Sequence, residues 1–183
     1  RLIRLCDATG DHERAIPMRD MQARWLSAMG DTSGELEART DSVTRRRKYR
    51  VDTDAIPDEN ITIARLEARL GNYEKGISIL DEVIGIHGVE NGPGIRTRTL
   101  ANAYIERGYI LHDRWEDGIL SEGRLPWIRV PQRDNFDDLD RAISDKEQAR
   151  KIIYSDSGLR KDKALVARIL ITLSYSHFYR GAR

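Results

Sequence analysis

Apolar residues recur at spacings of three and four along most of this chain, and this period constrains its fold more than any other feature. Such a spacing places apolar side chains on one face of an α-helix. Sustained alternation of apolar and polar residues is missing, and no Asn-Gly or Asp-Gly turn separates β-branched runs. The sequence therefore predicts an all-α fold. The clearest runs are Ile61, Ala64, Leu66 and Leu70, then Ile77, Leu80, Val83 and Ile84, and later Leu165, Ile169 and Leu173.

The same period, together with the helix breakers between the runs, predicts eight helices. Two segments interrupt this helical spacing of apolar residues. Residues 50–57 contain Pro57 and the run Asp52-Thr53-Asp54, which suits a cap at the start of the next helix. Residues 113–136 hold two glycines and two prolines, so we expect a short helix near 115–121 and then a long loop. The expected helices cover residues 1–9, 12–28, 34–49, 58–70, 73–86, 96–112, 137–153 and 160–180.

Three segments share a turn former, a small residue five positions later and then an isoleucine. They are residues 10–16, 71–77 and 137–143. The turn former ends one helix where the chain reverses, and glycine tolerates the positive φ that such a turn often requires. The small residue lets the new helix approach its predecessor closely, and the isoleucine fills the shared core. The pattern predicts helical hairpins with Ala15, Gly76 and Ala142 at the close contacts.

The segment 71–84 resembles the second helix of a tetratricopeptide repeat, with Tyr73 at the aromatic position and Gly76 where alanine is usual. Residues 170–181 are similar to the first helix of such a repeat. The resemblance implies antiparallel helical hairpins stacked into a right-handed superhelix, as one domain over residues 1–183. The small residues lie 61 and 66 positions apart, near two units of about 34 residues each. The tryptophan usual at the family's first core position is missing. A non-repeating α-bundle and another family of helical hairpins are the alternatives.

The net charge is close to zero, because 31 Lys and Arg residues balance 30 Asp and Glu residues. It therefore does not favour binding to nucleic acid or membranes. No apolar run is long enough to span a membrane. The single cysteine, Cys6, excludes an internal disulfide framework and favours a reducing compartment, so a cytoplasmic location is expected. Both ends resemble interrupted helices, and we expect the chain to be a fragment of a longer protein.

Residue types that carry catalysis or bind metals form no recognisable motif. The four histidines are scattered, and none lies four positions from another histidine. A metal site needs at least three converging ligands, whereas His-x-x-x-Glu spacings arise by chance in a chain this charged. Cys6 has no identifiable base beside it, and the glycine-rich turns match no phosphate-binding loop. We therefore expect no enzyme activity, no metal and no cofactor.

Arginines recur at the position that lines the inner groove of tetratricopeptide repeats. A guanidinium group binds carboxylates and phosphates in a bidentate manner. The resemblance thus implies a concave, Arg-lined groove that binds a peptide or helix, preferably an acidic one. The alternative is that arginine is simply abundant. The groove position falls on Arg4, Arg65, Arg107 and Tyr175, with Arg69 and Arg168 beside it.

A second group of cations, five within six residues, comprises Arg45, Arg46, Arg47, Lys48 and Arg50. Consecutive helical residues point in different directions, so these side chains do not form a stripe on one face. Cations near the C-terminus of a helix are stabilised by the helix dipole, which is the simplest explanation. A basic docking patch for an acidic partner or for nucleic acid is the alternative.

These observations favour a protein–protein interaction scaffold that holds a peptide or helix of another protein. The first alternative is a regulatory or sensor domain of a larger signalling or transcription-regulating protein. Such a domain binds a small effector or other domains of its own parent chain. RNA binding through the cationic residues is the second alternative, with nucleic acid the less favoured partner.

Overall fold

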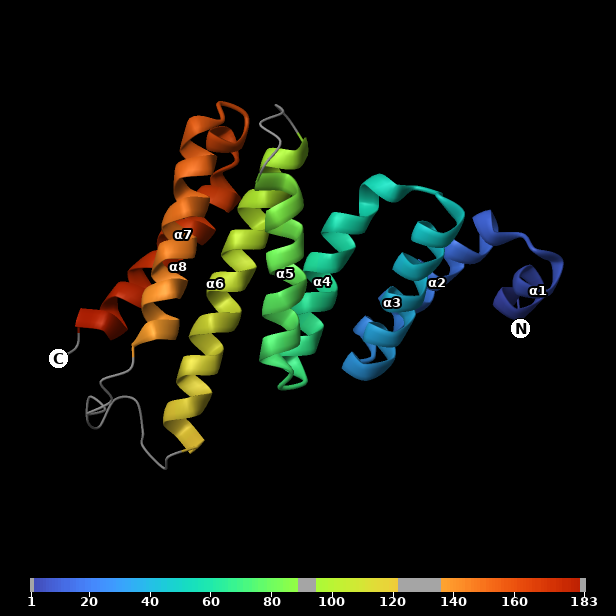
Figure 1. Cartoon of the computed structure of the whole chain (residues 1–183), viewed down its shortest axis with the longest axis horizontal. Helices are drawn as coiled ribbons and strands as arrows, with labels where there is room; N and C mark the ends of the chain where they lie inside the picture. The colour runs from blue at the N-terminus through green and yellow to red at the C-terminus, as the bar shows by residue number, and fades with distance from the viewer. Residues whose placement is uncertain (1, 89–94, 122–135, 182–183) are drawn as a thin grey trace. The chain divides into compact units, whose positions relative to one another are not determined.

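A computed structural model of the chain describes residues 2–88, 95–121 and 136–181 (Figure 1). These ranges contain helices and turns and no β-strand, which confirms the all-α prediction. The predicted helix 12–28 has the observed bounds, and most other helix ends differ from the prediction by only a few residues. The elements are α1 (Leu2–Thr9), α2 (His12–Ala28), α3 (Thr32–Tyr49), η1 (Thr53–Ala55), α4 (Ile56–Arg69), α5 (Tyr73–Gly88), α6 (Ile95–Ser121), α7 (Asp137–Ser155), η2 (Leu159–Lys161) and α8 (Lys163–Gly181).

The helices form two compact units, Arg1–Gly76 and Ile77–Arg183. The first unit contains α1 to α4, the second contains α6 to α8, and α5 begins at the boundary between them.

In the first unit, α3 runs antiparallel to α2, and α4 runs antiparallel to α3 (Figure 1). The turns at Gly10 and Gly71 have φ values of 71° and 83°, so the predicted positive φ is confirmed at both glycines. Asp11 and Asp31 cap α2 and α3, because their side chains accept hydrogen bonds from backbone N–H groups in the first turn. The small residue Ala15 is fully buried, as the repeated pattern predicts.

The segment between α3 and α4 differs from the prediction. Asp52 and Asp54 do not cap α4, which begins at Ile56 with Pro57 in its first turn and without a side-chain cap. Proline is favoured there because the first turn of a helix leaves its N–H groups without partners. The Asp52 carboxylate instead accepts a hydrogen bond from Arg46 Nη2 at 3.3 Å.

In the second unit, α6, α7 and α8 form an antiparallel series (Figure 1). The helices α6 and α7 approach each other closely at Gly108, where an added Cβ would lie 3.0 Å from the backbone oxygen of Ala142. Ala142 itself is fully buried, so the small residue of the third pattern faces the preceding helix as predicted. The main core cluster of this unit comprises Ala101, Ile105, Ala149, Ile153, Leu159, Leu165, Ile169 and Leu173.

The predicted break at residue 113 is wrong, because α6 continues to Ser121. The apolar period extends past the expected helix end: Leu111 and Trp115 are both buried, and Trp115 belongs to a cluster with Phe136 and Leu139. This packing stabilises the last turns of α6 and outweighs the cost of Gly118 within the helix. Residues 122–135 of the expected loop lie outside the described residues.

Candidate functional site

The second unit contains a pocket of about 220 Å³ to which α6, α7 and α8 all contribute. Four of its side chains can be charged, and they come from α6 and α7. The helix α8 supplies apolar and hydroxyl groups. The wall comprises Tyr109, His112, Asp113, Glu116, Lys146, Ile171, Thr172 and Tyr175.

The imidazole of this pocket belongs to His112, which is buried, with 4% of its surface exposed. Its ring packs against aromatic rings, with centroid distances of 5.4 Å to Tyr175 and 5.6 Å to Tyr179. Burial, followed by the charge of Lys146, lowers the pKa of the imidazole to about 4, so the ring is neutral near pH 7. The buried Nε2 atom has no hydrogen-bond partner within the described part of the chain.

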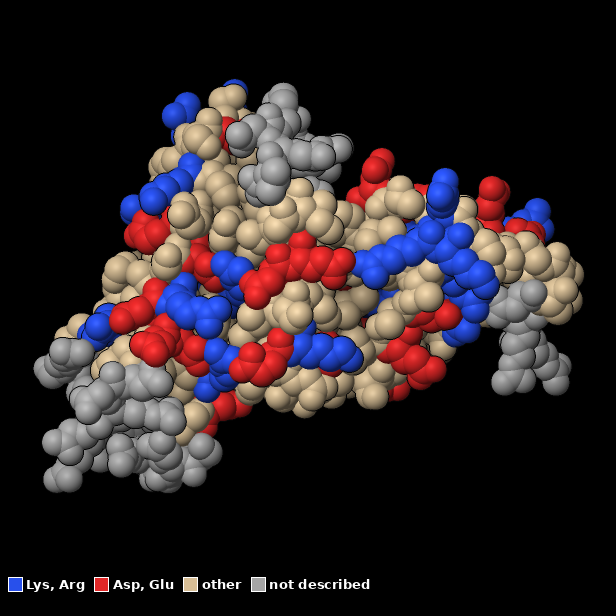
Figure 2. Space-filling view, viewed as in Figure 1, with Lys and Arg blue, Asp and Glu red and all other residues tan. Residues whose placement is uncertain are grey.

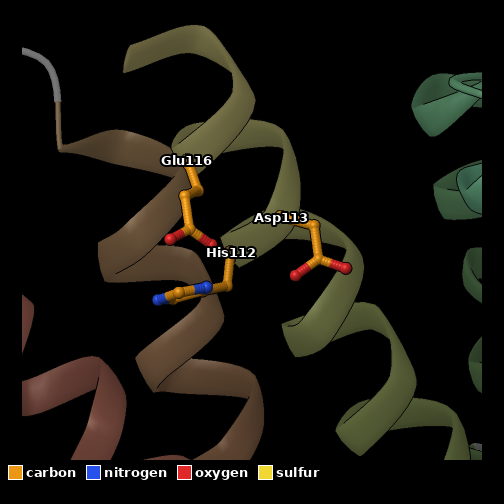
Figure 3. Close-up of side chains that lie close together, drawn as sticks. All are labelled: His112, Asp113 and Glu116. Atoms are coloured by element: carbon orange, nitrogen blue, oxygen red, sulfur yellow. The ribbon is translucent and has the colours of Figure 1, made fainter. Parts of the chain in front are cut away.

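Three potential ligand groups lie together on α6 (Figure 3). One ring nitrogen of His112 and one carboxylate oxygen each from Asp113 and Glu116 all lie within 4.8 Å of one another. Although Asp113 as a whole is exposed, partial burial of its carboxyl group and then the charge of Glu116 raise its pKa. The sequence analysis set this group aside, because it treated His-x-x-x-Glu spacings, which include that of His112 and Glu116, as chance occurrences in a highly charged chain.

Lys146 brings a buried cation to the same pocket, with only 1% of its surface exposed. Its Nζ donates a hydrogen bond of 2.7 Å to Ser176 Oγ and lies 5.2 Å from the centre of the Tyr109 ring. Burial lowers the pKa of the ammonium group to about 8, although the charges of Asp113 and Asp145 act to raise it. An amine with this pKa is mostly protonated near pH 7 and loses its proton as the pH rises through about 8.

Two of the predicted groove arginines join helices within the second unit. Arg107 on α6 donates hydrogen bonds of 2.8 and 2.7 Å to both carboxylate oxygens of Asp145 on α7, and it also pairs with Asp81 on α5. Arg168 on α8 pairs with Glu106 on α6 and lies over the Tyr109 ring. Both guanidinium groups are therefore already bound to carboxylates of this chain.

The other predicted groove residues have different surroundings. Arg69 is exposed at the end of α4, whereas Arg65, one turn earlier, is half-buried and interacts with other groups. Tyr175 is exposed on α8, and its hydroxyl group lies 2.9 Å from that of Tyr179. The side chain of Arg4 lies outside the described residues.

The predicted basic patch is divided between buried and exposed side chains. Arg46 is only 4% exposed, and its guanidinium group binds Asp20, Asp52 and Ser42. It therefore contributes no charge to an exposed surface. Arg45 is half-buried and donates a hydrogen bond of 2.8 Å to Asp41. Arg47, Lys48 and Arg50 are exposed, with Lys48 over the Tyr49 ring and Arg50 in the left-handed conformation.

Cations and anions are mixed on the face shown in Figure 2. Lys and Arg side chains alternate with Asp and Glu side chains over much of it, rather than forming a band of one sign. This distribution agrees with the ion pairs of Arg107 and Arg168, which join neighbouring helices.

A second surface, on α2 of the first unit, was not identified from the sequence. Met21 and Trp25 on α2 and Met29, the residue that caps the end of α2 in a helical conformation, are 66%, 71% and 63% exposed. Their spacing of four places them on one face of the helix. We name these three residues the α2 ridge. Gln22 and Leu26, on the neighbouring face of α2, line a groove of about 570 Å³. The rest of the groove is lined by Arg19, Gly34, Leu36, Glu37, Ala38, Thr40, Asp41, Thr44, Glu67 and Lys75.

No protein-family model matches the chain, and no curated protein matches its sequence. Among the described residues, none of the helices combines the length and apolar character that a membrane span requires. Function is therefore inferred from the geometry of the pocket and of the α2 ridge.

Proposed function

We propose that this chain is a protein-interaction module that binds a peptide or helix of another protein on its first unit. The α2 ridge supplies the apolar contacts, and the groove beside it receives side chains of the partner. The observation that carries the proposal is the exposure of Trp25 between two exposed methionines on one helix face.

A tryptophan in this position has a clear physical role in binding. Its large apolar ring gains free energy when a partner removes it from water, and its indole N–H can donate a hydrogen bond at the edge of the contact. Methionine is flexible and polarizable, so Met21 and Met29 can adapt to apolar side chains of different shapes. Tryptophan is also enriched among the residues that contribute most to protein interfaces.

The groove beside the ridge supports a peptide or helix as the occupant. Its wall combines the apolar Leu26 and Leu36 with charged groups of both signs, including Arg19, Asp41 and Lys75. An amphipathic segment fits such a surface because its apolar side chains meet the ridge and its polar groups meet the groove.

The architecture we propose is a right-handed, tetratricopeptide-like stack of helical hairpins. It is supported by the antiparallel order of helices within each unit, by the glycine turns and by the buried small residues at the predicted contacts. Within this proposal, Arg65 and Arg69 on α4 add contacts to acidic residues of the partner. Arg107 and Arg168 hold helices together instead.

Selection from a displayed peptide library tests the proposal and does not require an identified partner. Peptides selected on the whole chain should bind the Trp25→Ala variant more weakly by about thirtyfold, which corresponds to roughly 2 kcal/mol for a hot-spot residue. Phe178→Ala is the matched control, because Phe178 is an aromatic residue of similar exposure in the second unit. Equal binding of the selected peptides to Trp25→Ala and to the unaltered chain would refute the assignment.

A further inference from the structure

The strongest unexplained feature is the group of His112, Asp113 and Glu116 at the pocket of the second unit. Their positions on α6 explain why they meet. Glu116 follows His112 by four residues and Asp113 by three, and both spacings make neighbours on a helix surface. Figure 3 shows the Glu116 side chain one turn along from the other two.

The spacing of the three donor atoms approaches that of a coordination sphere. All three lie within 4.8 Å of one another. Ligand atoms about 2.0–2.2 Å from a zinc ion lie about 3–4 Å apart when the geometry is tetrahedral. Small rotations of the two carboxylate side chains, which lie toward the solvent side of α6, would close this difference.

An independent observation at His112 points to a ligand. The ring is almost fully buried and Nε2 has no partner within the described residues. A buried polar atom without a partner costs free energy, and an ion is one of the groups that can remove this cost. The spacing of the three donor atoms belongs to the ring as it stands. A half-turn of the ring about its bond to Cβ moves Nε2 to the side of the carboxylates, where an ion would be the partner that it lacks. The neutral imidazole is also the form that binds metals.

The charges of the group favour a divalent cation. Asp113 and Glu116 repel each other, and a cation between them would relieve that repulsion. The buried Lys146 opposes a cation, but its Nζ is held by Ser176 Oγ on α8 at 2.7 Å. One nitrogen ligand with two carboxylates suits zinc and other first-row transition metals, whereas magnesium and calcium prefer oxygen ligands alone.

We propose that His112, Asp113 and Glu116 bind a divalent transition-metal ion, with Zn²⁺ as the best match, at the side of the pocket formed by α6. The exposed Asp113 lies at the solvent side of this group, and the ion reaches the buried His112 from there. Three protein ligands leave at least one position of the ion free for water or for a bound molecule.

The test is metal binding by the whole chain after treatment with a chelator. Competition with a chromophoric chelator should show one Zn²⁺ per chain, and X-ray absorption at the zinc edge should show scattering from one imidazole. Asp113→Asn and Glu116→Gln change residues that are not fully buried and should each weaken binding by about tenfold or more. Circular dichroism checks that both variants remain folded.

Glu147→Gln is the matched control, because Glu147 Oε1 lies 3.9 Å from His177 Nε2 and forms a second His–carboxylate pair on the surface. This control should change the affinity by less than about twofold. Absence of saturable binding, or unchanged binding in both Asp113→Asn and Glu116→Gln, would overturn the proposal. Loss of binding in Glu147→Gln would assign the ion to His177 instead.

Discussion

Arg46 on α3 and Asp20 on α2 form a largely buried ion pair, with Arg46 Nη2 2.7 Å from Asp20 Oδ2. A second hydrogen bond joins Arg46 Nη1 to Asp20 Oδ1 at 3.1 Å, and Ser42 contacts both partners. The bidentate pair links the two helices that carry the α2 ridge and its groove. It makes Arg46, which the sequence groups with exposed cations, a structural residue of the first unit.

Replacing Arg46 should destabilise the first unit strongly. Arg46→Met leaves Asp20 with a negative charge and without its main partner, and breaking a buried pair in this way costs about 3 kcal/mol. Urea unfolding followed by circular dichroism measures the change. Arg14→Ala, which removes an exposed ion pair with Asp11, should change the stability by less than about 0.5 kcal/mol. Equal effects of the two variants would contradict the structural role of Arg46.

The same pair predicts a loss of stability in acid. Burial acts to raise the pKa of Asp20, but hydrogen bonds from Arg46 and Ser42 and the charge of Arg46 outweigh it, so the pKa lies below 3.8. Because the pKa of Asp20 is lower in the folded chain, the unfolded chain binds the proton at a higher pH than the folded chain does. The contribution of Asp20 is therefore complete above its unfolded pKa and is lost as the pH falls through its folded pKa.

Urea unfolding at a series of pH values tests whether the contribution of Asp20 to stability falls as the pH falls. The difference in stability between the unaltered chain and Asp20→Asn should be largest above about pH 5 and should shrink below about pH 4. A difference that stays constant down to pH 2, or grows in acid, would show that the pKa of Asp20 is not lowered by folding.

The space around two helical glycines predicts opposite effects on stability when each is replaced by alanine. Gly108 lies where α6 contacts α7, and Gly85 lies in α5 with open space beside it. Gly108→Ala should destabilise the second unit by about 1–3 kcal/mol, because the new Cβ would lie 3.0 Å from both the Ala142 oxygen and Lys146 Cγ. Gly85→Ala in α5 meets nothing within 4 Å, so the higher helix propensity of alanine should stabilise the chain by up to about 1 kcal/mol. Thermal unfolding of both variants measures the contrast. Stabilisation by Gly108→Ala would show that the two helices are further apart.

The arginines should separate into a binding group and a structural group. Arg65→Ala with Arg69→Ala should weaken the binding of acidic peptides, and Arg69→Ala alone, at an exposed position, should do so with little change in the melting temperature. Arg107→Ala should instead lower the melting temperature, since it removes contacts with Asp145 and Asp81 and leaves both acids without this partner. Peptide titration and thermal unfolding of the same samples distinguish the two effects. A loss of stability in the double variant, without loss of affinity per folded molecule, would exclude Arg65 and Arg69 from the binding surface.

The helices could be predicted from the sequence because their signals are local. Apolar period, glycine turns and N-terminal aspartates lie within a few residues of the structure that they determine, as at Gly10 and Asp11. The end of α6 was predicted wrongly because Trp115 is stabilised by Phe136 and Leu139, which are more than twenty positions away. A pattern of neighbouring residues cannot predict a contact between residues so far apart in the sequence.

The candidate sites depended still more on distant packing. Arg107 is separated from Asp145 by 38 positions, so its spacing on α6 could not show that it is paired. The environment of His112 is formed by Tyr175 and Tyr179 on α8. The spacing of Met21, Trp25 and Met29 is the same one that marks a buried helix face, and only the fold shows that this face is exposed.

Hydrogen–deuterium exchange of the chain with a selected peptide is the most direct measurement of partner binding on the first unit. Binding at the α2 ridge and its groove predicts slower exchange in α2 and α3, with little change in α6, α7 and α8. Protection confined to the helices of the second unit, with α2 exchanging as in the free chain, would contradict the proposed function.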